Sequence, residues 1–108
     1  TYKNIRQHFQ PTNESGYVVD FAILDKQEKP IYIMAVKDSL SALRATSLCL
    51  RVSNLGLNHT SIAVHDNTST SSIAKRDQDA LTNAVDKQYT SLMDFESQAE
   101  NFISRQIA

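Results

Sequence analysis

The chain has 108 residues, of which 41% are hydrophobic, two are glycine and two are proline. This length allows one domain with one core, and the low glycine and proline content excludes a linker or low-complexity chain. The formal net charge of −1 excludes a bulk positive field that would attract nucleic acid to the whole surface. The charge is uneven, however: residues 1–65 carry seven Lys or Arg against five Asp or Glu, and residues 66–108 carry four against seven. We therefore expect any anion-binding surface in the first part.

The chain contains one cysteine, Cys49, so a disulfide framework is excluded. Cys49 lies in an apolar helical context, and we expect a small buried side chain in a reducing compartment rather than a nucleophile. No apolar run approaches the roughly 18 residues that a membrane-spanning helix needs, and no signal-peptide pattern opens the chain. We therefore expect a cytoplasmic protein without membrane association. The first residue, Thr1, suggests a domain cut from a longer polypeptide.

Three strands are predicted in the first third of the chain. Residues 2–10 suit one face of a strand, although the spacing of Ile5 and Phe9 also suits a helix. Residues 17–24 and 31–36 are rich in β-branched and aromatic side chains, and turn residues separate the three segments. The pattern therefore favours a three-stranded antiparallel meander.

A carboxylate and a lysine fall near the middle of this meander. If Leu24 pairs with Ile31, Asp20 lies opposite Ala35 and diagonal to Lys37 on one face of the sheet. The two charged groups form either a catalytic pair or a partly buried ion pair that sets strand register. We favour the ion pair, because an unpaired carboxylate among apolar strand neighbours is costly.

A helix of about four turns is predicted over residues 39–54, with Asp38 or Ser39 as N-cap. Arg44 and Arg51 lie two turns apart on one face, where they either contact a phosphate or face solvent. Two neighbouring lines of apolar or small side chains predict a largely buried helix. These lines are Leu40, Leu43, Ser47 and Leu50, and Ala42, Ala45, Cys49 and Val52.

A second strand–helix unit follows. Residues 59–65 predict a strand parallel to the one before the helix, with Asp66 and a Ser/Thr-rich loop at its carboxyl end. A helix over 73–88 places Lys75 and Arg76 in its first turn, where the helix dipole disfavours cations. This position hints at an anionic partner unless nearby acids compensate, namely Asp77 and Asp79. The helix should bury Ala74, Leu81, Ala84, Val85 and Ile73.

The carboxyl-terminal part contains one more helix. Residues 89–93 form either a brief edge strand or a continuation of the preceding helix. Residues 94–106 predict an amphipathic helix that presents an apolar stripe to the core and acidic side chains to water. The stripe is Phe95, Ala99, Phe102 and Ile103, and the solvent face carries Glu96, Glu100 and Arg105.

This order of elements resembles the core of the restriction-endonuclease-like family, which is named for its PD-(D/E)XK motif. In that family the first acid lies on the second strand of the meander, and the (D/E)XK tripeptide lies on the third strand before the core helix. Asp20 matches the first acid, and Ala35-Val36-Lys37 occupies the tripeptide, so the lysine is present and the second acid is an alanine. The resemblance covers roughly residues 3–66 and implies an α/β (α+β) domain with a mixed sheet. A V-D-F strand followed by an apolar strand and a helix is also similar to small uncharacterised domains of bacterial and prophage proteins.

The resemblance implies metal-dependent phosphodiester hydrolysis, but the residues are unfavourable for it. Mg²⁺ is usually anchored by one or two carboxylates, and here Asp20 is a single carboxylate beside the neutralising Lys37. We therefore expect no efficient nuclease activity and no cofactor. The acids that could replace the missing one are Glu14, Asp38 and Asp66, of which Asp38 suits helix capping better. The three histidines have no metal-ligand spacing and suit strand ends or the surface: His8, His59 and His65.

Three functions remain open from the sequence. The first, which we favour, is a catalytically decayed nuclease-like domain that binds or regulates, with protein or nucleic acid as the partner. Its cations would be Arg44, Arg51, Lys75 and Arg76. The second is a nuclease that uses Asp20 and Lys37 with Mg²⁺. The third is a phage-encoded or immunity-type inhibitor that binds a protein through the acidic carboxyl-terminal helices.

Overall fold

The structure of the protein is a computed structural model that describes residues 4–12, 14, 16–26, 28–65 and 73–107. These residues form an α+β fold with a mixed sheet, as the sequence predicts, and contain five strands and three helices. The helix predicted over 73–88 is shorter than expected and ends at Ala84, because the fifth strand takes up the end of that segment. The strands are β1 (Ile5–Phe9), β2 (Val19–Ile23), β3 (Ile31–Val36), β4 (Thr60–His65) and β5 (Lys87–Tyr89). The helices are α1 (Ser39–Asn54), α2 (Lys75–Ala84) and α3 (Leu92–Ile107).

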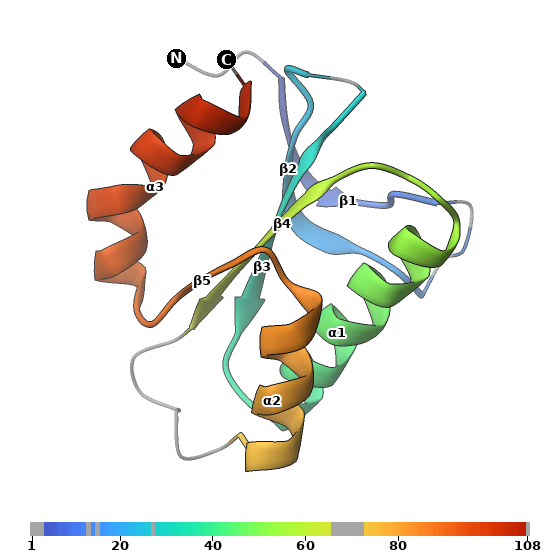
Figure 1. Ribbon diagram of the computed structural model, residues 1–108, viewed down its shortest axis with the longest axis vertical. Coiled ribbons are helices and arrows are strands. Elements are labelled where there is room, and N and C mark those ends of the chain that lie inside the picture. Colours follow the sequence, from blue (N-terminus) through green and yellow to red (C-terminus); the bar gives the residue numbers. More distant parts are fainter. Residues whose placement is uncertain (1–3, 13, 15, 27, 66–72, 108) are drawn as a thin grey trace.

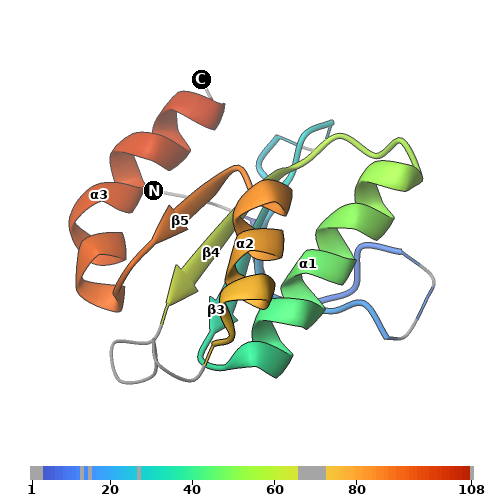
Figure 2. The ribbon, with the colours of Figure 1, turned by 60° about the horizontal axis from the view of Figure 1, so that its bottom comes forward.

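The strands form one mixed sheet in the order β1-β2-β3-β4-β5. The first three strands are the predicted antiparallel meander, and β4 and β5 continue the sheet in parallel with β3. The crossover helices α1 and α2 pack side by side on one face, and α3 lies on the other face over β4 and β5 (Figure 1 and Figure 2). Within the described residues, no helix has the length and apolar character needed to span a membrane.

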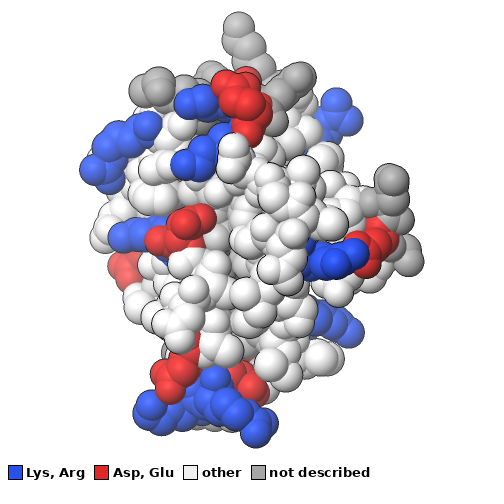
Figure 3. Space-filling view, turned by 45° about the vertical axis from the view of Figure 1, so that its right-hand side comes forward, with Lys and Arg blue, Asp and Glu red and all other residues white. Residues whose placement is uncertain are grey.

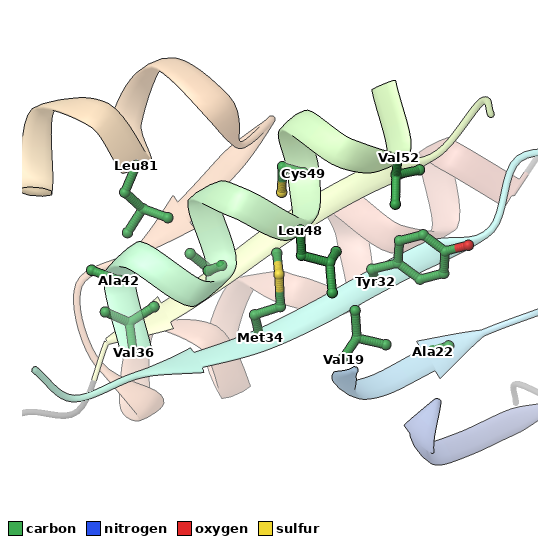
Figure 4. Packing of buried hydrophobic residues seen from close by; sticks show 12 residues of the cluster. Val19, Ala22, Tyr32, Met34, Val36, Ala42, Leu48, Cys49, Val52 and Leu81 are labelled. Atoms are coloured by element: carbon green, nitrogen blue, oxygen red, sulfur yellow. The ribbon is translucent and has the colours of Figure 1, made fainter. Parts of the chain in front are cut away.

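The larger part of the core lies between α1 and the sheet. Figure 4 shows Leu48 and Val52 of α1 directed at the sheet, where Met34 and Tyr32 of β3 lie beneath them. Small side chains on the same face of α1 bring its backbone close to the strands, and Leu81 joins the cluster from α2. A second cluster fills the space beneath α3 and contains Ile23, Ile31, Ile62, Val64, Tyr89, Ala99 and Ile103. The predicted inward stripe of α3 therefore faces the core.

The predicted burial of α1 is only half correct. Its buried face carries Ala42, Ala45, Thr46, Leu48, Cys49 and Val52. The other predicted line points outward, with Leu40, Leu43 and Leu50 exposed by 56%, 43% and 53%. The reason is that the sheet lies beneath one face of α1 and α2 lies at its side, so none of the described helices and strands covers its outer side. Ala74 is also exposed, because it lies at the N-cap of α2 rather than inside the helix.

The predicted register of the β2–β3 hairpin is wrong by one residue. Ile23, not Leu24, is opposite Ile31. The β2–β3 ladder ends at this pair, and the backbone N–H of Leu24 donates to the carbonyl of Asn4, at 2.8 Å. The hydrophobic pattern did not distinguish the two registers, because apolar residues occupy both strand ends.

Strand β2 loses its alternation at Asp20. Val19 and Ala22 are three residues apart, yet both belong to the cluster under α1, while Ile23 belongs to the cluster under α3. On the neighbouring strand β1, His8 has a positive φ of 49°, an uncommon conformation for a residue other than glycine. At this point the side chains of β2 therefore switch the face of the sheet to which they point. The Asp20 carboxylate can then extend toward the neighbouring strand β3.

Cys49 provides a direct test of the packing beneath α1. Burial raises the pKa of its thiol to about 11, although the Ser61 hydroxyl lowers it in part. At about pH 8 only about 0.1% of such a thiol is ionised, against roughly a quarter of a free cysteine. We therefore expect the folded protein to react with a thiol-specific reagent at least about 100-fold more slowly than the urea-unfolded chain. Equal rates in the two states would contradict the described packing.

Candidate functional site

A hollow of about 430 Å³ lies where β2, the end of β3 and the first turns of α1 meet. Its polar side chains are Asp20, Lys37, Ser41 and Arg44. Its apolar lining is Val18, Met34, Ala35, Ala45 and Leu48. The predicted residues Asp20 and Lys37 thus share a hollow despite the register error, and Arg44 joins them because α1 begins directly after Lys37.

Asp20 does not form the predicted ion pair. Its Oδ2 accepts the backbone N–H of Ala35, at 2.7 Å, just beyond the last paired position of the β2–β3 ladder. Among the described residues, Lys37 and Asp20 form no ion pair. The Asp20 carboxylate therefore has a structural role: it accepts the Ala35 N–H in place of a backbone carbonyl where the β2–β3 ladder ends.

The amino terminus of α1 forms the wall of the hollow and is closed by a reciprocal cap. The Asp38 carboxylate accepts the backbone N–H of Ser41, at 2.8 Å, and the Ser41 hydroxyl accepts the backbone N–H of Asp38, at 3.1 Å. The expected capping role of Asp38 is confirmed. The part played by Ser41 was not predicted, although a serine three residues after an aspartate N-cap is a recognisable capping signal.

The hollow does not suit the divalent metal that the family resemblance implies. It holds two cations and one carboxylate, and one oxygen of that carboxylate already accepts the Ala35 N–H. The described chain contains no group of three His, Cys, Asp or Glu side chains that could hold a metal ion. Of the substitute acids, Glu14 binds Arg51, Asp38 caps α1, and Asp66 lies outside the described residues. The donor set therefore favours an anion over a cation.

The other predicted cations lie elsewhere, each beside an acid. Arg51 binds Glu14 at 2.7 Å, on the carboxyl-terminal half of α1. In α2, acids on the same helix lie beside the two first-turn cations: Lys75 binds Asp79 at 2.9 Å, and Arg76 lies 3.7 Å from Asp77. Figure 3 shows the side of the molecule that carries α1, where Lys and Arg lie beside Asp and Glu around an uncharged centre. Among the residues that the structure describes, this face therefore has no continuous basic track of the kind that follows a nucleic-acid backbone.

A second, smaller hollow of about 330 Å³ lies at the carboxyl end of β4 and was not predicted. His65 is buried there, and its Nε2 lies 2.8 Å from Oε1 of Gln88. The same Gln88 oxygen accepts from Gln78, at 2.9 Å, and the Gln88 amide donates to Thr82, at 2.8 Å. In the tautomer that has its proton on Nε2, His65 would donate to this amide oxygen. These side chains bond to one another and tie α2 to β4 and β5, which is a structural role.

The chain matches no family model, no curated protein and no solved structure. The likeness to the endonuclease-like core therefore stays a hypothesis based on the order of elements and on two residues. Asp20 lies on the second strand of the meander, and Lys37 follows the third strand directly before α1. Ala35, where that family has its second acid, lines the same hollow.

The Asp38 cap predicts a specific dependence of stability on pH. Hydrogen bonds from the backbone N–H and hydroxyl of Ser41 lower the pKa of Asp38 below its ordinary value of 3.8. The cap therefore contributes stability above that value, and the contribution is lost as pH falls through the lowered pKa. Asp38→Asn keeps a capping oxygen but cannot titrate.

We expect the advantage of the wild-type protein over Asp38→Asn to be constant near neutral pH and to shrink below about pH 4. Urea unfolding of both proteins between about pH 7 and pH 2.5 measures this difference. Parallel losses of stability over the whole range would show that another group titrates.

Proposed function

We propose that this domain is a non-catalytic binding module, built on a nuclease-like core, that receives an anionic group between Lys37 and Arg44. The observation that carries the proposal is the composition of the Asp20 hollow. Two cations face one carboxylate, and that carboxylate is engaged by the Ala35 N–H. The side chains that line the hollow therefore carry a formal charge of +1, and the Asp38 carboxylate, which is outside this lining, interacts electrostatically with both cations.

Hydrolysis of a phosphodiester in the nuclease alternative requires a metal that polarises the phosphate and activates water. Lys37 and Arg44 would repel such a metal, and Asp20 alone gives it one anchoring residue. These two cations can instead neutralise an incoming phosphate or carboxylate. The remaining chemistry of the hollow is recognition, and we expect no turnover.

The bound group should be small. Among the described residues, Arg51, Lys75 and Arg76 each lie within 4 Å of an acid, whereas Lys37 and Arg44 interact with Asp38 without forming an ion pair, so Lys37 and Arg44 would make the main contacts. For single-stranded DNA, two phosphate contacts give a slope of about −1.4 when the logarithm of the binding constant is plotted against that of salt concentration. An acidic peptide would offer the same negative charge through its carboxylates. Phosphates of DNA and carboxylates of a peptide therefore need separate binding probes.

The test uses a fluorescein-labelled dT12 oligonucleotide and, in parallel, a labelled peptide of twelve glutamates. With dT12 we expect a salt slope of about −1.4, falling to about −0.7 in Lys37→Ala and in Arg44→Ala. Arg51→Ala is the matched control on the same helix, and its slope should equal that of the wild type because Glu14 already binds Arg51. Binding of the glutamate peptide alone would identify an acidic protein as the partner. Binding of neither probe would refute the proposal.

Asp20→Asn separates this proposal from the nuclease alternative. Asparagine keeps an oxygen for the Ala35 N–H but removes the negative charge from the hollow. We therefore expect dT12 to bind a few-fold more tightly, by the roughly 1 kcal/mol of repulsion that one charge exerts nearby in a solvated site. Plasmid incubated with Mg²⁺ or Mn²⁺ should stay intact with both proteins. Cleavage by the wild type that disappears in Asp20→Asn would establish the nuclease instead.

A further inference from the structure

The Asp20 hollow has an apolar inner wall and a charged mouth. Met34 and Leu48 line it and are only 3% and 2% exposed, so they belong to its inner wall. In Figure 4, Met34 of β3 points toward α1 beside Leu48. Lys37 and Arg44 also line the hollow but are exposed, so the two cations lie at its mouth. A ligand that enters the hollow would therefore meet positive charge at the mouth and apolar surface behind it.

The charge at the mouth suits a ligand with one negative charge. The lining carries a formal charge of +1, because the Asp20 carboxylate lies beside the two cations. The Asp38 carboxylate also interacts with both of them from outside the lining. A carboxylate brings one negative charge, whereas a phosphate monoester brings about −1.5 to −2 at pH 7. Since like charges repel, the two carboxylates of the protein favour a ligand that carries a single carboxylate.

Charge alone would hold such a ligand weakly. Contacts between exposed ions contribute little to affinity, because water screens them and flexible side chains must be fixed. One such contact contributes about as much as the burial of one methylene group. The volume of about 430 Å³ also exceeds what a carboxylate needs, since pockets for small molecules begin at roughly 300 Å³. The apolar wall can therefore contribute as much to binding as the cations do.

We infer that the ligand of the Asp20 hollow is a small organic acid, with one carboxylate attached to a compact apolar body. The carboxylate would lie between Lys37 and Arg44, and the body would contact the inner wall and the half-exposed Val18. A sugar–phosphate chain would instead place polar groups against the apolar wall, where they lose water without gaining hydrogen bonds. This inference rests on the proposed function, and it names the class of molecule that supplies the anionic group.

The test titrates acetate, butyrate and hexanoate into the protein and follows its NMR signals. We expect the Kd to fall about two- to fourfold with each added methylene group, because each one is buried against the wall. Hexanoate should then bind at least about tenfold more tightly than acetate. Hexanamide has a body of the same length without the charge, and it should bind several-fold more weakly than hexanoate. The methyl signal of Met34 should shift with hexanoate and stay in place with acetate.

Four variants locate the two parts of the ligand. Lys37→Ala and Arg44→Ala remove a cation and should weaken all three acids by a similar factor. Val18→Thr places a hydroxyl in the lining and should weaken hexanoate about twofold while leaving acetate unchanged. Phe21→Thr is the matched control at a separate apolar groove of about 420 Å³, which lies beside α3 and is called the α3 groove. Phe21 lines that groove and not the hollow, so this variant should bind hexanoate like the wild type.

The failures of the two proposals are distinguishable. Equal affinity for acetate and hexanoate, weakened by Lys37→Ala, would overturn the small-acid inference and leave the anion site in place. Hexanoate binding that is unchanged in Lys37→Ala, or lost in Phe21→Thr, would overturn it by placing the acid in the α3 groove. No binding of any acid at about 50 mM, with normal binding of dT12, would also overturn this inference alone. If dT12 and the glutamate peptide fail to bind as well, the proposed function falls with it.

Discussion

The hydrogen bond from the Ala35 N–H to the Asp20 carboxylate determines much of this structure. It lies where the β2–β3 ladder ends and where β2 changes the face to which its side chains point. One oxygen of the carboxylate is occupied by this backbone N–H, and the two cations beside Asp20 give the lining of the hollow a net positive formal charge. The same change of face turns Phe21 toward the α3 groove while Val19 packs beneath α1. Asp20 therefore carries, together with Lys37, the residue part of the resemblance to a nuclease core, and it also enters the argument against hydrolysis.

The meander, the parallel crossover and the capped helix were predictable because each depends on local chemistry. Strand segments rich in β-branched residues, the Asp38 cap and the crossover rule need no knowledge of the tertiary structure. The hairpin register was not predictable from the same pattern, because apolar residues stand at the strand ends in either register, and only the structure shows Ile23 opposite Ile31. The His65–Gln88 network was missed for a similar reason, since its members lie 23 residues apart and join only when β4 and β5 pair.

The positions of the cations show how much of the candidate anion site composition alone can predict. The excess of Lys and Arg in the first part of the chain directed attention to an anion site there, and Lys37 and Arg44 do share a hollow in that part. Arg51 lies two turns after Arg44 on the same side of α1, yet it binds Glu14, which is 37 residues away in the sequence. Sequence spacing places a side chain on a helix face, but only the fold decides which acid arrives beside it. Exposed pairs of this kind contribute little stability, and their effect here is to restrict where an anion can bind.

The prediction that both apolar lines of α1 are buried was wrong for a physical reason. Two lines of apolar residues on one helix are typical of a helix that is covered on most of its circumference. The sheet and α2 cover one line, and the leucines of the other remain at the surface. A single chain of this size has too few elements to cover both faces of its sheet and the outer side of α1. The apolar groove beside α3 and the exposed leucines of α1 are two consequences of that shortage. The sequence pattern alone does not distinguish a helix covered on most sides from one whose second apolar line stays at the surface, because the difference depends on how many elements pack around it.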